Sequence, residues 1–269
     1  MIREHALFIP HASAHLAAVL TLPHRDPRGL VLLLTGLAAT RSHRFGMWTR
    51  TARRLAAERG LASLRLDYAG TGDSTRYAAR WAEDSREQVS AAVDLALRAC
   101  GVGTFAAAGN CLGGRHALEL AAGRRDCVGA VCIRPELAPV QELIAQARRT
   151  GTRRLLGRGR GGTGSRESVD PGMAQLLSAV AGKRVLFLYG ESGGRAIDAA
   201  RPLLEDLVRS VPTRARGHLE VRVVPEISLV GFRSLDAQRV TVDAVIGWME
   251  MPFSPANGPA VAGRDVVGL

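Results

Sequence analysis

Residues 104–122 read TFAAAGNCLGGRHALELAA, and this stretch decides the fold of the chain. A short apolar run precedes Gly109, and an alanine- and leucine-rich segment typical of a helix follows Gly114. Glycines two residues before and two residues after Cys111 let the backbone make a tight, strained turn between the two elements. At such a junction the central side chain sits at a helix N-terminus, where unpaired N–H groups and the helix dipole favour a thiolate. Cys111 is therefore the predicted nucleophile, and the competing interpretation is a small buried cysteine in a glycine-rich turn.

Strands and helices are predicted to alternate on both sides of this junction. The N-terminus reads as a hairpin, and continuous apolar runs typical of strands buried on both faces follow it. The predicted strands are 5–10, 15–23, 29–36, 61–68, 104–108, 128–134, 183–189 and 219–224, and the helices 47–59, 85–100, 115–122, 196–209 and 235–251. Ser85-x-x-Gln88 is interpreted as a capping box that opens the second helix. The alternation indicates right-handed βαβ units and a mostly parallel sheet covered by helices on both faces.

The alternation is interrupted between Leu137 and Met173, where a short helical pattern leads into a glycine- and arginine-rich stretch at 150–170. A long irregular insertion in a compact domain is usually a lid or a disordered loop. Because this insertion follows the strand after the Cys111 junction, we expect it to lie over the thiol. The predicted organisation is one domain over residues 1–251, with a lid at about 138–175, and a C-terminal tail at 252–269.

Composition limits the classes of function. The net charge of +11 is almost entirely arginine and is spread over helices and loops, without a nucleic-acid-binding signature. The four cysteines show neither metal-ligand spacing nor the density of a disulfide scaffold. No apolar run has the length of a membrane span. We therefore expect a reduced, cytoplasmic protein that needs no metal or cofactor and binds neither nucleic acid nor membrane, while an acidic partner such as a carrier protein or a CoA thioester agrees with the charge.

Three further features accompany the cysteine turn: the strand ending Leu34-Thr35-Gly36, the turn RLDYAGTGDS at residues 65–74, and the closing helix with Trp248. Over roughly residues 5–250 the chain resembles the α/β-hydrolase superfamily, whose R-x-D-x-x-G-x-G-x-S turn is similar to residues 65–74. GNCLGG at 109–114 is similar to the cysteine elbow of dienelactone hydrolases, and Ser42-His43-Arg44 resembles a segment of the cysteine-elbow hydrolases of exosortase-type systems. The resemblance implies an α/β-hydrolase fold with a mostly parallel central sheet flanked by helices.

The same resemblance implies an acid after the strand at 183–190 and a histidine after the strand at 219–224. Glu191 is the candidate acid, with a solvated loop carboxylate as the alternative. The loop at 225–232 contains no histidine, and His218 stands at the start of its strand, on the order of 20 Å from the edge that would face Cys111. His116 is expected to pack or to face solvent.

His43 is the remaining candidate base, because it follows the strand whose loop usually supplies part of the oxyanion hole. Its alternative is an ordinary loop histidine. The oxyanion hole is expected to use the backbone N–H of Leu112 and that of Leu37 or its neighbour. Asp67 and Asp73, in the glycine-rich turn, are expected to brace loops around the site.

A missing histidine is less damaging to a cysteine nucleophile than to a serine nucleophile. A few per cent of a thiol is already ionised at neutral pH, whereas a serine hydroxyl needs a base. The leading hypothesis is an acyl-processing enzyme, a thioesterase, acyltransferase or cyclase, in which Cys111 attacks an ester or thioester, with specialised metabolism as the expected setting. The alternatives are a non-hydrolytic lyase, eliminase or cyclase that uses His43, Asp67 or Glu191 for proton chemistry, and an inactive binding protein with a relic turn.

Overall fold

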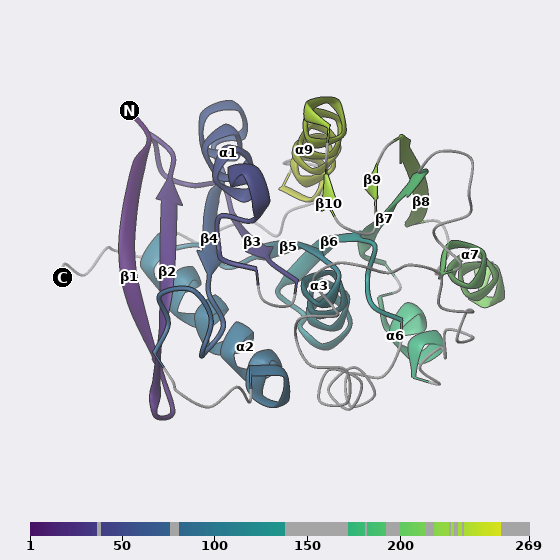
Figure 1. Cartoon of the computed structure of the whole chain (residues 1–269), viewed down its shortest axis with the longest axis horizontal. Coiled ribbons are helices and arrows are strands. Elements are labelled where there is room, and N and C mark those ends of the chain that lie inside the picture. The colour runs from purple at the N-terminus through teal and green to yellow at the C-terminus, as the bar shows by residue number, and fades with distance from the viewer. Residues whose placement is uncertain are drawn as a thin grey trace.

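The computed structural model describes residues 1–36, 39–75, 81–137, 172–180, 182–191, 200–213, 218–225, 227–228, 231–232 and 234–253 (Figure 1). The predicted lid lies almost entirely outside these residues, as does the chain beyond Phe253. Among the described helices, none is both long and apolar enough to cross a membrane.

The described strands form an eight-stranded sheet with the order β1-β2-β4-β3-β5-β6-β7-β8. Its strands are β1 Arg3–His11, β2 Ala14–Leu22, β3 Leu30–Leu34, β4 Ala62–Leu66, β5 Phe105–Asn110, β6 Cys127–Ile133, β7 Arg184–Glu191 and β8 Leu219–Pro225. β1 and β2 pair antiparallel, β2 runs antiparallel to β4, and every pairing from β4 to β8 is parallel. The short strands β9 Ile227–Ser228 and β10 Gly231–Phe232 pair with each other after β8. The predicted parallel sheet with an N-terminal hairpin is confirmed.

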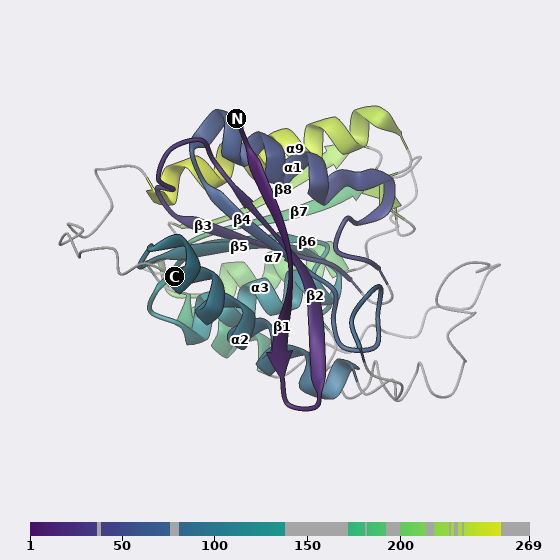
Figure 2. The same cartoon turned by 90° about the vertical axis from the view of Figure 1, so that its left-hand side faces the viewer.

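Helices cover both faces of the sheet, as the two views show (Figure 2). α1 and α9 pack on one face, whereas α2, α3, α6 and α7 pack on the other. Their bounds are α1 Met47–Arg54, α2 Trp81–Cys100, α3 Leu112–Gly123, α6 Met173–Ala179, α7 Ala200–Ser210 and α9 Leu235–Glu250, with shorter turns η1 Arg44–Gly46, η2 Leu55–Arg59 and η3 Met251–Phe253. The strand sequence LVLLL of β3 is fully buried because its residues alternate between the two cores.

The start of α2 differs from the predicted capping box. The helix already begins at Trp81, so Ser85 lies inside it. The Ser85 hydroxyl bonds to the His116 ring at 2.9 Å, and the Gln88 side chain accepts a hydrogen bond from the Ala69 N–H at 2.9 Å. The capping-box prediction was wrong because both polar side chains have tertiary partners, which the local pattern does not contain.

Pro252 and Phe253, which follow the expected domain boundary at residue 251, pack against the sheet. Pro252 is buried, and its ring lies 3.2 Å from where a Cβ on Gly129 would stand. The ring of Phe253 fills the space beside Gly29, and its carbonyl accepts a hydrogen bond from the Arg28 guanidinium at 2.9 Å. These contacts join the end of the described chain to the amino-terminal edge of the sheet.

Candidate active site

Cys111 occupies the junction between β5 and α3, with φ 53° and ψ −121°. A residue with a side chain adopts this backbone conformation only when its surroundings enforce it. The Cys111 N–H donates to the Ile133 carbonyl at 2.9 Å, and its own carbonyl accepts from the N–H groups of Arg115 (3.1 Å) and Glu136 (3.3 Å). The thiol is half-buried. β6 and the segment after it therefore hold the predicted nucleophile in its strained position.

The glycines around Cys111 are required by close backbone packing. A Cβ on Gly109 would stand 2.2 Å from the Gly113 carbonyl oxygen, and one on Gly113 would stand 2.6 Å from the Thr35 carbonyl oxygen. Neither glycine has a positive φ; in this turn the strain is at Cys111 itself. The prediction of a tight strand–turn–helix junction is confirmed, and its glycines serve chiefly to let α3 approach β3 and β5.

One half of the expected oxyanion hole is described. Leu112 is the first residue of α3, so its N–H has no acceptor within the helix. The segment just after β3 lies beside Cys111, because a Cβ on Gly36 would stand 3.1 Å from the Cβ of Cys111. Leu37, the other expected donor, lies outside the described residues. The oxyanion-hole roles of Leu112 and Leu37 both stay predictions.

Tyr68, which the sequence reasoning did not single out, is electrostatically coupled to Cys111. Burial raises the pKa of the Tyr68 hydroxyl, and the nearby charges of Cys111 and Glu119 raise it further. This hydroxyl has no hydrogen-bond partner among the described residues. It therefore stays protonated and is a donor held near the thiol. Its position directly after Asp67 in the glycine-rich turn was the one available sequence signal.

His43 is buried between aromatic rings. Its ring meets Trp48 edge-on at 5.9 Å and Phe232 at 5.5 Å between centroids, and its Nδ1 has no hydrogen-bond partner among the described residues. Burial lowers the pKa of His43 to about 4, so the ring is neutral at physiological pH. Phe232 belongs to β10, in the segment after β8 where an α/β-hydrolase carries its histidine. The structure thus brings His43 to that segment from a different part of the chain.

The strand register shows at which edge of the sheet Glu191 and His218 lie. Asn110, Ile133 and Leu188 lie side by side across β5, β6 and β7, so Glu191 ends β7 three residues beyond that row. It shares the carboxyl edge of the sheet with Cys111, and its backbone pairs with Pro225. His218 precedes β8 at the opposite edge and is exposed, which confirms that it lies far from Cys111.

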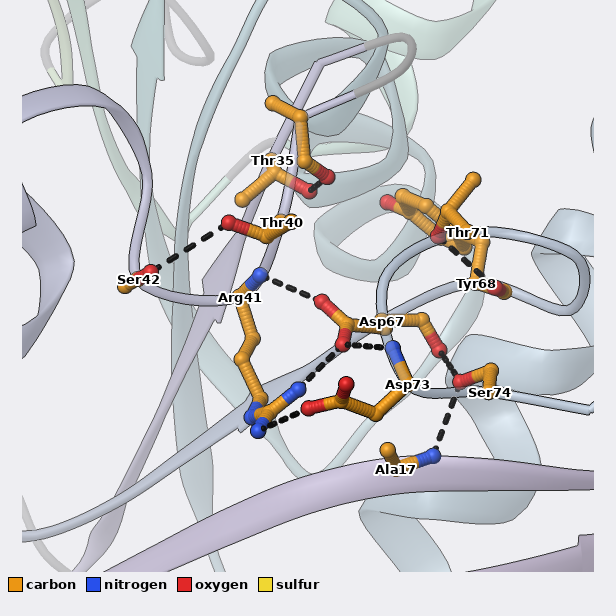
Figure 3. Close-up of polar contacts among 11 residues, drawn as sticks. Ala17, Thr35, Thr40, Arg41, Ser42, Asp67, Tyr68, Thr71, Asp73 and Ser74 are labelled. Atoms are coloured by element: carbon orange, nitrogen blue, oxygen red, sulfur yellow. Dashed lines mark hydrogen bonds and ion pairs between the residues drawn. The ribbon is translucent and has the colours of Figure 1, made fainter.

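Asp67 braces the loop between β3 and α1 (Figure 3). Its buried carboxylate accepts hydrogen bonds from the Arg41 backbone and guanidinium and from the Asp73 N–H at 3.1 Å. The Arg41 guanidinium also pairs with Asp73 at 2.7 Å. A Cβ on Gly72 would stand 2.1 Å from the Asp67 carboxylate, which explains the glycine at this place. The predicted bracing role of Asp67 and Asp73 agrees with these contacts; Arg41, the partner of both, was missed because its partners are distant in sequence.

His116 belongs to α3 and is buried against α2 instead of facing solvent. Its Nε2 lies 2.9 Å from the Ser85 hydroxyl, and its Nδ1 lies 3.3 Å from the Glu119 carboxylate, which also pairs with Arg115 at 2.8 Å. The ring of His116 meets that of Tyr68 edge-on at 6.0 Å. Because Ser85 is fully buried, this serine–histidine–glutamate chain is a polar support between α2 and α3 and not a second nucleophile.

No protein-family model matches the chain, and no curated protein matches its sequence. Solved structures do match. Est1E from Butyrivibrio proteoclasticus with ferulic acid bound superposes with a TM-score of 0.65 at 18% identity, over 92% of this chain and 99% of that one. An esterase of Pyrococcus furiosus superposes with a TM-score of 0.66 at 12% identity, over 94% of each chain. A dienelactone hydrolase of Anabaena variabilis superposes with a TM-score of 0.58 at 17% identity, over 92% of this chain and 96% of that one. The chain has the α/β-hydrolase fold that the sequence predicted.

Proposed function

We propose that this chain is an acyl-processing enzyme whose nucleophile is Cys111. One observation carries the proposal: the cysteine stands in a strained conformation at the N-terminus of α3, half-buried, where a strand–turn–helix junction presents its side chain. A helix N-terminus favours the thiolate over the thiol. A turn that only packed the strand against the helix would not need a residue with a side chain at φ 53° between glycines.

The covalent step would proceed in the ordinary way for a thiolate. The Cys111 sulfur forms a bond to the acyl carbon, and the bond from that carbon to the alcohol or thiol of the substrate breaks. The leaving group departs with the electron pair and takes up a proton. The N–H groups of Leu112 and Leu37 would stabilise the intermediate oxyanion. His43 and Glu191 are the proposed proton acceptor and its acidic partner.

An ester or thioester is the proposed substrate class. The superposed proteins from Pyrococcus furiosus and Butyrivibrio proteoclasticus are an esterase and a protein with bound ferulic acid, which supports a small-molecule ester. The net charge of +11 suits an anionic form of the substrate, such as one linked to CoA or to an acidic carrier protein. We place this activity in a reducing compartment, because none of the four cysteines, all of which the structure describes, forms a disulfide.

Acyl transfer is favoured over rapid hydrolysis. No histidine follows His218 in the sequence, and His43 is a weak base because burial lowers its pKa to about 4. Water needs a base to attack an acyl-enzyme, whereas an amine or thiol acceptor is itself a strong nucleophile. The acyl group on Cys111 would then pass mainly to such an acceptor.

The test is pre-steady-state turnover of p-nitrophenyl butyrate and of butyryl-CoA. We expect a burst of p-nitrophenolate close to one equivalent, followed by slow turnover that added hydroxylamine accelerates. Cys111→Ala abolishes the burst, while Cys100→Ala, which removes another half-buried thiol, keeps it. Full turnover in Cys111→Ala would refute the nucleophile, and a slow phase indifferent to hydroxylamine would refute acyl transfer.

A further inference from the structure

A cavity of about 470 Å³ lies on the α1 side of the sheet, and Cys111 is not among the residues that line it. Its floor is a row of neighbouring residues on three strands, Ala6 of β1, Val19 of β2 and Arg65 of β4. α1 and the loops after β3 and β4 form its walls. β3 stands between β4 and β5, so the strand that leads to Cys111 takes no part in the cavity. The volume falls within the range of small-molecule sites.

Three arginines from different elements line this cavity: Arg41 from the loop after β3, Arg53 from α1 and Arg65 from β4. Arg53 and Arg65 share one carboxylate, because Glu4 accepts from Arg53 at 2.6 Å and from Arg65 at 2.8 Å. Arg41 is paired with Asp67 and Asp73, and its guanidinium and their carboxylates are visible together in Figure 3. Arg53 and Arg65 thus share one carboxylate, whereas Arg41 has two, so the three arginines are matched by three carboxylates.

Arg65 has a hydrogen-bond donor that these carboxylates leave unsatisfied. Its side chain is only 5% exposed, and its Nε–H has no acceptor among the described residues, although its other nitrogens bond to Thr49 and Glu4. Burial lowers the pKa of Arg65, the charge of Glu4 opposes this shift, and the charges of Arg53 and Arg41 add to it. A buried guanidinium N–H without an acceptor is costly, and a bound oxyanion would supply that acceptor. Hydroxyl groups of Thr40, Ser42 and Thr49 also line the cavity and are neutral hydrogen-bond donors.

We propose that this cavity binds an oxyanion, the phosphate or carboxylate group of a small molecule, at a site separate from Cys111. Planar guanidinium groups bind both kinds of oxyanion through paired hydrogen bonds, and the hydroxyls supply further donors. The apolar floor of Ala6 and Val19 accommodates the remainder of the molecule. This site does not depend on covalent chemistry at the thiol, so it holds whether or not Cys111 is the nucleophile.

The test is calorimetric titration of the full chain with sodium phosphate and with sodium succinate. The ionic strength is kept constant with sodium chloride, because non-specific attraction to a chain of charge +11 is screened equally by all salts. We expect saturable binding of one or both anions, and the tighter of the two identifies the group that the site prefers. Arg53→Gln should weaken that binding about tenfold, the effect of one lost charge-assisted hydrogen bond.

A second variant, expected to change anion affinity in the opposite direction, tests the proposal if Arg53→Gln is poorly folded. Glu4→Gln removes the carboxylate that competes with the anion and should strengthen binding severalfold. The matched controls are Arg239→Gln and Glu58→Gln, which make the same changes of charge in exposed ion pairs elsewhere. Binding that does not saturate, or Glu4→Gln and Arg53→Gln proteins that bind like their controls, would overturn the proposal.

Discussion

His43 illustrates how the surroundings of a single residue decide its chemistry. Its sequence position marked it as a candidate base, and the structure buries it against Trp48 and Phe232, with a pKa lowered to about 4. The sequence could predict the loop in which His43 lies but not its contact with Phe232, which is almost two hundred residues away in a different element. A neutral imidazole at physiological pH can accept a proton, but only weakly. Because this burial exists only in the folded chain, the pKa of His43 changes when the chain unfolds.

The pKa of His43 predicts a pH-dependent stability. Below about pH 6.5 the unfolded chain protonates this histidine, whereas the folded chain does so only near pH 4. The contribution is therefore complete above pH 6.5 and is lost as the pH falls to 4, for a total of about 3 kcal/mol. Urea unfolding between pH 4 and pH 7 measures it. His43→Gln should flatten this part of the profile, and His218→Gln, at an exposed position, should not; identical profiles for the two variants would contradict the assignment.

At the scale of elements, the β5–turn–α3 unit was predictable because its signal is local. The apolar strand, the glycines and the helical segment are contiguous in sequence, and they appear in the structure as predicted. The start of α2 was not predictable in the same way. Ser85 and Gln88 form a capping pattern locally, but their partners His116 and Ala69 come from other elements. Arg41, the partner of Asp67 and Asp73, escaped notice for the same reason.

Two glycines of α3 give a matched test of this close packing. Gly113→Ala would put its methyl group 2.6 Å from the Thr35 carbonyl oxygen, a contact with backbone that cannot move aside. We expect a loss of about 1–3 kcal/mol in the free energy of unfolding. Gly123→Ala, at the end of the same helix, meets nothing within 4 Å and should be neutral or stabilising by a few tenths of a kcal/mol. Thermal and urea unfolding compare the two, and equal effects would show that the packing at Gly113 is looser than described.

At the scale of the whole molecule, the order of strands and the two helical layers follow from the alternation of apolar strands and helices, together with the handedness of βαβ units. Cys111, Leu112 and Glu191 lie at the same edge of the sheet because the parallel strands end there together. Sequence reasoning did not foresee the contact between Phe253 and the segment just before β3. Phe253 packs on Gly29 and bonds to Arg28, and neither partner carries a recognisable local signal.

This contact predicts the cost of removing the Phe253 ring. Phe253→Ala should lower the free energy of unfolding by about 1–2 kcal/mol, since a half-buried aromatic ring is lost from the edge of the sheet. Phe8→Ala removes the same ring from a side chain that is 59% exposed and should cost less. Urea unfolding of both variants is the measurement. A Phe253→Ala protein as stable as the parent chain would show that the contact contributes nothing.

Acid-quenched peptide mapping after reaction with p-nitrophenyl butyrate shows which residue carries the acyl group. We expect a single butyryl adduct on the peptide that contains Cys111. The other three thiols should stay unmodified, because burial raises the pKa of Cys100 to about 11 and that of Cys127 to about 12, and raises that of Cys132 as well. Product formation with no adduct on Cys111, or an adduct on another cysteine that disappears with the activity when that residue is replaced, would contradict this expectation.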